Sequence, residues 1–175
     1  TESARVAQLL TEVQRLELLV SSTLMLGREQ TAECEPTALA GLIDEVADLM
    51  GPSLSHRGVE VERRCDELLH ASVDAVRLRQ AILNLVTNAA DAMPQGGRLL
   101  IVAEADIAHA TVTIAVEDSG PGVPEAIRTG LLDAPASTKP FGLGLGLAVC
   151  RDVAAAHGGT LRIECSTELG GARFV

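Results

Sequence analysis

The chain has 175 residues, of which 47% are hydrophobic, enough for one compact domain and a short appendage. The formal net charge is −10 without any dense Lys/Arg cluster, which argues against nucleic acid or an anionic membrane surface as the main partner. No apolar run reaches the roughly 18 residues that a membrane span needs. We expect a soluble, cytoplasmic piece without membrane contact of its own, although a longer parent chain could be membrane-anchored.

The first part of the chain, from Ser3 to Gly27, is amphipathic. Its apolar residues alternate between spacings of three and four: Val6, Leu9, Val13, Leu16 and Val20. This spacing predicts a long helix with a coiled-coil-like seam. The polar stretch 28–36 is typical of a linker, so we expect helix and linker in residues 1–33 and the main domain in residues 37–175.

The main domain carries both helix and strand signals. Thr37 is a candidate N-cap for a helix that ends at Gly51-Pro52, residues 74–93 have helical periodicity, and a last helix ends at His157 with Gly158 and Gly159 as its stop. Strand-like runs lie at 59–65, 98–107, 109–118, 160–165 and 172–175, the second and third of which form a predicted hairpin. These patterns predict an α+β fold, a two-layer α/β sandwich with helices on one face of a mixed, mostly antiparallel sheet.

The four cysteines are widely spaced and form no CxxC pair: Cys34, Cys65, Cys150 and Cys165. This spacing suggests neither a zinc site nor a small disulfide scaffold. Free cysteine commonly serves as a small core residue. We therefore expect reduced, buried thiols.

A glycine-spaced loop precedes the last predicted helix. Its alternating residues are Gly142, Leu143, Gly144, Leu145, Gly146 and Leu147. Glycines let backbone N–H groups approach a ligand, and a helix start offers unpaired N–H groups, so a phosphate chain is the natural ligand. Just upstream, Thr138 and Lys139 add a hydroxyl and an ammonium group. The alternative is a tight loop whose leucines fill the core, with an ordinary surface lysine.

Two asparagines, Asn84 and Asn88, lie four residues apart in the predicted helix at 74–93, so their amides share one face. Mg²⁺ accepts an amide oxygen ligand while keeping waters and substrate phosphates at its other positions. The amides can equally bond to neighbouring backbone groups.

A turn, "DSGPGVP", follows the predicted hairpin. Asp118 closes the strand, and Gly120 and Gly122 turn the chain immediately after it. A carboxylate here can accept a hydrogen bond from an exocyclic amino group such as that of adenine, and the glycines leave room for a flat base. An ordinary Asp-Ser-Gly-Pro turn is the alternative.

The order and spacing of these motifs resemble those of the catalytic ATP-binding domain of bacterial sensor histidine kinases, within the Bergerat-fold (GHKL) ATPase superfamily. The matching stretches are "RQAILNLVTNAADAM", "DSGPGVP", "STKPFGLGLGLAVC" and "GGARF". The resemblance covers nearly the whole chain from residue 37.

The resemblance implies a set of roles. Asn88 is the expected Mg²⁺ ligand and Asn84 its neighbour at the phosphates, while Asp118 is expected to read the adenine amino group. Thr138, Lys139 and residues 142–146 fall in the lid and phosphate loop. The implied activity moves the γ-phosphoryl group of ATP to a histidine on a dimerisation helix, and then to an aspartate of a response-regulator receiver domain.

The N-terminal helix resembles the second helix of the kinase dimerisation hairpin, which implies a homodimer; packing on its own domain is the alternative. No histidine precedes His56, so the phosphoacceptor is expected outside this chain, which we interpret as a fragment of a larger kinase. For His157 we expect a structural role.

The sequence also departs from the family pattern. Residues 131–137 replace a phenylalanine-rich box, Leu143 and Ala172 stand where many relatives have hydroxyl residues, and Asp91 occupies the place of a phosphate-binding lysine. These departures leave two alternatives open: a degenerate pseudokinase that serves as a scaffold, and a serine kinase of the anti-sigma-factor type.

Overall fold

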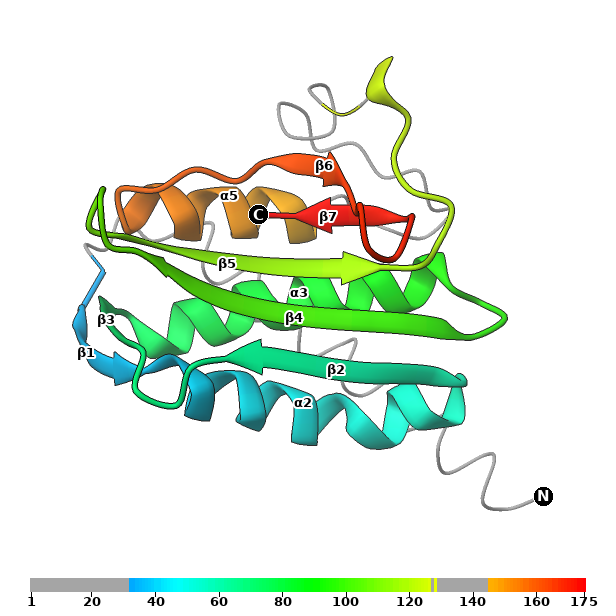
Figure 1. The fold of residues 1–175 in the computed structure, drawn as a ribbon, viewed down its shortest axis with the longest axis horizontal. Helices are drawn as coiled ribbons and strands as arrows, with labels where there is room; N and C mark the ends of the chain where they lie inside the picture. The colour runs from blue at the N-terminus through cyan, green and yellow to red at the C-terminus, as the bar shows by residue number, and fades with distance from the viewer. Residues whose placement is uncertain (1–31, 127, 129–144) are drawn as a thin grey trace.

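The computed structural model describes residues 32–126, 128 and 145–175, which form a two-layer arrangement of helices and strands (Figure 1). In chain order the elements are β1 (Glu35–Ala38), α2 (Leu39–His56), β2 (Val59–Cys65), β3 (His70–Val73), α3 (Ala75–Ala92), β4 (Gly97–Asp106), β5 (Thr111–Asp118), α5 (Leu145–Ala156), β6 (Ile163–Cys165) and β7 (Ala172–Phe174). The expected α+β sandwich is confirmed.

The main sheet has five strands in the order β2-β4-β5-β7-β6. Among the described strands of this sheet, β2 and β4 run parallel and the other neighbours are antiparallel. The predicted hairpin is confirmed as β4 and β5, which pair from Leu99 opposite Asp118 to Asp106 opposite Thr111. This register brings Asp118 to the end of β5, beside the start of β4.

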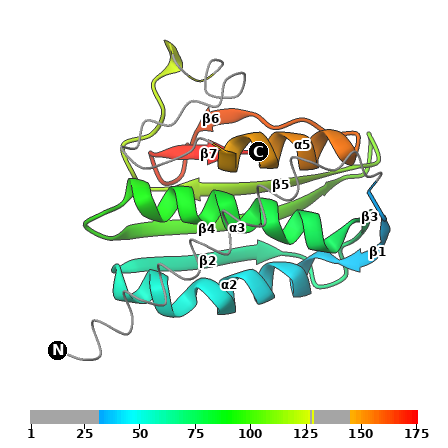
Figure 2. The same ribbon diagram turned by 180° about the vertical axis from the view of Figure 1, so that it is seen from behind.

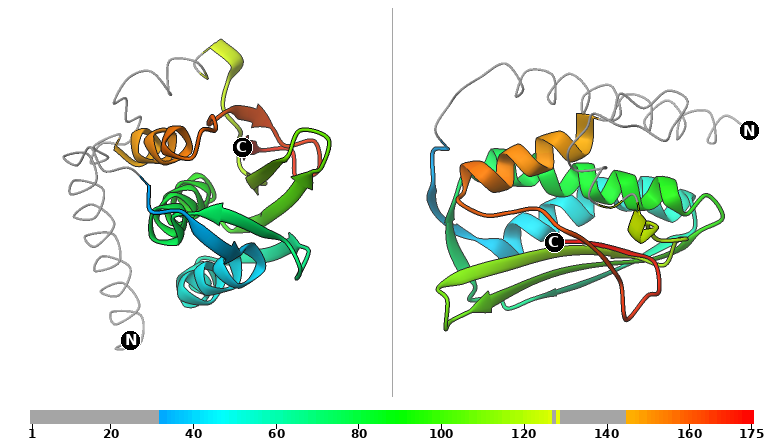
Figure 3. Two further views of the ribbon diagram at one scale, coloured as in Figure 1. Left: turned by 90° about the vertical axis from the view of Figure 1, so that its left-hand side faces the viewer. Right: turned by 90° about the horizontal axis from the view of Figure 1, so that it is seen from above.

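Helices α2, α3 and α5 cover one face of this sheet (Figures 2 and 3). Strand residues alternate between the two faces. Leu99 and Ile101 belong to the large core against the helices, whereas Leu100 and Val102 belong to a small apolar cluster on the other face. The helix layer and the sheet thus enclose one principal core.

The ends of α2 differ from the prediction. Thr37 is not its N-cap, because Thr37 Oγ1 donates to the Glu35 carbonyl and the first helical N–H, that of Leu39, donates to the Leu69 carbonyl at 3.0 Å. The helix also continues through Pro52 to His56. Proline removes one helical hydrogen bond, but Leu54 in the following turn is only 1% exposed, and its burial favours the extra turn.

A two-stranded ribbon, β1 with β3, was not predicted. Its strands "EPTA" and "HASV" are four residues each and have little apolar alternation, so no strand pattern marks them. The predicted linker was therefore wrong for Glu35 and Pro36. The predicted strand at 160–165 was too long, since β6 begins at Ile163.

The cysteines are free, but the prediction that all are buried was wrong. Only Cys150 is buried, Cys65 is half-buried, and Cys34 and Cys165 are exposed. Burial raises the pKa of the Cys150 thiol to about 12.

The predicted N-terminal helix lies outside the described residues, and the proposed boundary between residues 33 and 37 stays a prediction. In the part of the chain that the structure describes, no helix has both the length and the apolar character needed to cross a membrane.

Candidate functional site

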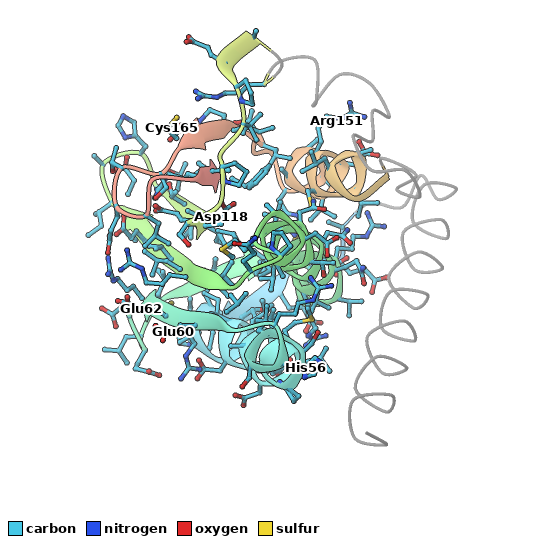
Figure 4. All side chains as sticks on the ribbon, turned by 90° about the vertical axis from the view of Figure 1, so that its right-hand side faces the viewer. His56, Glu60, Glu62, Asp118, Arg151 and Cys165 are labelled. Atoms are coloured by element: carbon cyan, nitrogen blue, oxygen red, sulfur yellow. The ribbon has the colours of Figure 1, made fainter. Side chains whose placement is uncertain are left out.

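Asp118 is the centre of the site. Its side chain is only 1% exposed, and Figure 4 shows it in the interior, between the strands and the helices. Oδ1 accepts hydrogen bonds from the N–H of Gly120 at 2.8 Å and from the N–H of Ala172 at 3.2 Å. Two backbone donors on one oxygen fix the orientation of the carboxyl group and leave Oδ2 for another donor.

Burial raises the pKa of Asp118, and the hydrogen bonds from Ala172 and Gly120 oppose that shift. No cation pairs with Asp118 among the described residues, and a buried carboxylate in such surroundings is a strong hydrogen-bond acceptor. An amino group of a bound ligand would satisfy it, which is the chemistry of adenine recognition.

Glycines surround Asp118 where the backbone approaches closely. A Cβ on Gly120 would lie 2.9 Å from Asp118 Oδ1, and a Cβ on Gly171 only 2.4 Å from the same atom. Gly122 adopts a φ of +71°, which favours glycine. Gly171 was not among the predicted site residues, although the "GGARF" motif that contains it was identified.

Helices α3 and α5 carry the second half of the site. Gly146, in the first turn of α5, lies against both asparagines: its Cβ would be 3.8 Å from Asn84 Cγ and from Asn88 Nδ2. At the other end of α5, His157 Nε2 accepts from the N–H of Asp74, at the start of α3, at 2.8 Å. The two helices therefore run antiparallel, and the start of α5 faces the asparagine turn of α3.

The asparagines differ in their surroundings. Asn84 is 6% exposed, and its Nδ2 makes no hydrogen bond of ordinary length among the described residues, but its side chain lies against the buried thiol of Cys150 on α5 and lowers the pKa of that thiol, against the larger effect of burial. Sulfur is a weak acceptor, so an oxygen acceptor on a ligand would satisfy this donor better than the thiol does. Asn88 is half-buried one turn later. A buried amide donor beside a glycine at a helix start fits phosphate oxygens, and the Asn88 amide is available as a ligand for a divalent cation.

The last turn of α3, from Asn88 to Ala92, connects the Asp118 half of the site with the asparagine half. A Cβ on Gly120 would lie 3.2 Å from the carbonyl oxygen of Ala92, at the end of α3. Along α3 the order is therefore Asp118 at the C-terminal end, then Asn88, then Asn84. The carboxyl group and the two amides therefore lie in a row along α3.

Some predicted site residues cannot be placed. Thr138, Lys139, Gly142, Leu143 and Gly144 lie outside the described residues. Leu145 begins α5, and Leu147 packs against the main core, so the core-filling alternative holds for that leucine.

Residues next to the site have structural roles in the fold. The predicted structural role of His157 is confirmed, because its Nδ1 bonds to the Val153 carbonyl at 2.8 Å as well as receiving the N–H of Asp74. Asp91 accepts a hydrogen bond from Arg57 at 2.8 Å, which ties α3 to the end of α2. Ala172 contributes its N–H to Asp118 but has no hydroxyl to offer.

Comparison with known proteins gives a consistent result. Residues 73–175 match the family described as histidine kinase-, DNA gyrase B-, and HSP90-like ATPase. Sporulation kinase A of Bacillus subtilis (strain 168) is 31% identical over 161 residues, which cover 91% of this chain and 26% of the relative. The chain thus spans about a quarter of the length of that curated relative.

Solved structures show the same fold. The catalytic domain of histidine kinase ThkA is 30% identical with a TM-score of 0.73, covering 81% of this chain and 92% of that one. ThkA in complex with response regulator protein TrrA is 29% identical with a TM-score of 0.75, covering 94% and 47%. Full-length ShkA in complex with AMPPNP is 30% identical with a TM-score of 0.73, covering 96% and 35%.

Proposed function

Because the chain belongs to the histidine kinase-, DNA gyrase B-, and HSP90-like ATPase family, we propose that it is the ATP-binding catalytic domain of a sensor histidine kinase. It binds Mg²⁺–ATP and presents the γ-phosphoryl group to a histidine outside this chain. The observation that carries the proposal is the order along α3, from the Asp118 carboxyl group to the buried Asn84 amide.

Adenine binds beside Asp118 in this proposal. Oδ1 is held by two backbone N–H groups, so Oδ2 accepts from the exocyclic amino group of the base. Gly120 and Gly171 keep side chains away from this carboxyl group, where a Cβ would collide with it. Burial of the base against the strand end excludes water and strengthens the hydrogen bond.

The phosphates lie at the other end of the site. Asn84 Nδ2 and the first N–H groups of α5 donate to phosphate oxygens, and Gly146 lets the chain pass close to them. Asn88 would hold Mg²⁺ through its amide oxygen, and the ion would neutralise phosphate charge during transfer. Thr138 and Lys139 add further phosphate contacts.

No general base is required from this chain. The neutral imidazole of the acceptor histidine already has a lone pair on one ring nitrogen, so positioning and charge stabilisation supply the catalysis. The described residues accordingly bind and orient the nucleotide.

The partners follow from the same proposal. ThkA has been solved with a response regulator, and we infer that the kinase to which this chain belongs passes its phosphoryl group to a receiver-domain aspartate. The apolar seam at residues 6–20 forms the homodimer interface. The domain itself acts in the cytoplasm.

Calorimetric titration of the 175-residue chain with AMPPNP, with and without Mg²⁺, tests the proposal. We expect binding in the micromolar to sub-millimolar range that strengthens with Mg²⁺. Absence of binding at millimolar AMPPNP would overturn the proposal in favour of a pseudokinase scaffold. A kinase assay with a separate histidine-containing dimerisation domain then tests transfer.

A further inference from the structure

The residue next to Asp118 in β5 is also a buried carboxylate. Glu117 is 4% exposed and lies on the opposite face of the sheet from Asp118, because successive strand residues alternate. Both of its oxygens are paired: Oε1 accepts from Arg173 of β7, and Oε2 accepts from the Ser166 hydroxyl at 2.6 Å. The site described above makes no use of these three residues.

Ser166 closes the loop between β6 and β7, residues 166–171. Its hydroxyl donates to Glu117 and accepts from the N–H of Leu169 at 2.8 Å. Its N–H donates to the Gly171 carbonyl at 2.9 Å, and its carbonyl accepts from the N–H of Gly170 at 3.1 Å. A residue that is 4% exposed and bonded in four ways fixes the shape of this loop.

The C-terminal end of the loop, at Gly171 and the start of β7, contacts Asp118 at the end of β5. The N–H of Gly171 donates to the Asp118 carbonyl at 3.1 Å, and the N–H of Ala172 donates to its carboxyl Oδ1 at 3.2 Å. The loop is thus attached to both neighbours in β5: to Glu117 on the outer face and to Asp118 on the inner face.

Further contacts hold the loop against the outer face of the sheet, where Figure 3 shows it projecting away from the helices. Leu169 packs on the small apolar cluster of Leu100, Val102 and Ala115. Glu168 accepts two hydrogen bonds from Arg64 of β2, at 2.6 and 2.7 Å. The loop therefore spans the sheet from β7 to β2.

We propose that Glu117, Ser166 and Arg173 are positioning residues that set the preference of the site for adenine, by fixing the loop whose backbone orients the Asp118 carboxyl group. The inference rests on the proposed binding of adenine at Asp118. Loss of the Ser166–Glu117 bond loosens the start of the loop, so the Ala172 N–H holds Oδ1 less firmly and the N–H of Gly120 remains as the other donor to that oxygen. The base loses its aligned acceptor, while the phosphate end at Asn84 is untouched.

Comparing the binding of ATP with that of purine riboside triphosphate distinguishes this positioning role from general support of the fold. Purine riboside triphosphate has a hydrogen in place of the adenine amino group, so it binds without the bond to Asp118. The ratio of its dissociation constant to that of ATP measures the contribution of the amino group alone. In the parent chain, we expect the dissociation constant of purine riboside triphosphate to be about 10 or more times that of ATP. A hydrogen bond to a charged group contributes enough binding free energy for a ratio of this size.

The variants are Ser166→Ala, which deletes the hydroxyl, and Glu117→Gln, which keeps the size of the side chain and removes its charge. Ile43→Val is the matched control: Ile43 is 1% exposed in the core on α2, so the change lowers stability without touching the loop. All dissociation constants are measured by calorimetry with Mg²⁺, at a temperature where circular dichroism shows each variant folded.

We expect Ser166→Ala and Glu117→Gln to reduce the ratio of the two dissociation constants at least about threefold. The reason is that a misaligned Asp118 weakens the bond to the adenine amino group, which ATP has and purine riboside triphosphate lacks. Ile43→Val should leave the ratio unchanged. An unchanged ratio in both loop variants, or an equal fall in Ile43→Val, would overturn the inference. A parent chain that binds both nucleotides equally would instead contradict adenine reading by Asp118, and one that binds neither would contradict the proposed function.

Discussion

Gly171 lies so close to Asp118 that a Cβ on the glycine would stand 2.3 Å from the aspartate carbonyl oxygen and 2.4 Å from its carboxyl Oδ1. The backbone that enters β7 thus packs directly on the end of β5. This contact explains the glycine at position 171, whereas Gly170 before it adopts a φ of +85°. The contact also makes the loop between β6 and β7 a wall of the proposed adenine site.

The first prediction concerns Gly171→Ala. The added methyl group must displace either the loop or the Asp118 carboxyl group, because the atoms that it meets are mainly backbone. We expect unfolding to become easier by about 1–3 kcal/mol and ATP binding to weaken at least about tenfold. Chemical denaturation and calorimetry measure the two effects.

Gly41→Ala is the control for Gly171→Ala. Gly41 lies in α2, and its Cβ would meet nothing within 4 Å. Alanine there should raise stability by up to about 1 kcal/mol without changing nucleotide affinity. If Gly171→Ala were as harmless as Gly41→Ala, the close approach of β7 to Asp118 would be wrong.

Gly146→Ala should separate stability from binding. Its Cβ would make ordinary contacts of 3.8 Å with Asn84 and Asn88, so the fold accommodates it, and alanine is the better helix former by about 1 kcal/mol. The same methyl group occupies space between the two amides and the start of α5. We expect unchanged or higher stability with weaker binding of AMPPNP, and a variant that binds like the parent would place the phosphates elsewhere.

Asn88→Ala tests the metal ligand. Asn88 is half-buried, so its removal should leave the fold intact while abolishing the strengthening of AMPPNP binding by Mg²⁺. Thr87→Ala is the neighbouring control, because the Thr87 hydroxyl bonds to the Leu83 carbonyl of its own helix at 2.8 Å. The assignment of Asn88 is wrong if the two variants show the same dependence on Mg²⁺.

Much of the fold was predictable because its pattern is local. Helix α3 (Ala75–Ala92) follows the helical periodicity of residues 74–93, and β4 and β5 largely coincide with the strand-like runs at 98–107 and 109–118. The ribbon of β1 and β3 was not predictable, because its stability depends on pairing between segments about 35 residues apart and not on apolar alternation.

Part of the candidate site was also predictable, because its motifs are local in the sequence. Asn84, Asn88 and Asp118 stand in contiguous motifs that can be found in the sequence. The contribution of Gly171 depends on the approach of β7 to β5, and that of Glu117 depends on a partner 49 residues later, so neither follows from local spacing.

The last prediction concerns pH and uses Asp118→Asn. Asp118 has a pKa raised above its ordinary value of 3.8 by burial, so the folded state binds a proton at pH values where the unfolded state has lost it. In that window the stability of the parent falls as pH rises, and the loss is complete above the raised pKa. Asparagine does not titrate, so the variant lacks this term.

The stability of Asp118→Asn minus that of the parent should therefore rise as pH increases from 3.8 through the raised pKa and then level off. Urea denaturation at a series of pH values measures the difference, in which the other carboxyl groups cancel. ATP binding should be lost at neutral pH, because the amide keeps its oxygen on the N–H groups of Gly120 and Ala172 and turns an NH₂ donor towards the adenine amino group. A difference that is flat with pH, or that falls, would show that Asp118 is not the buried acceptor assigned to it.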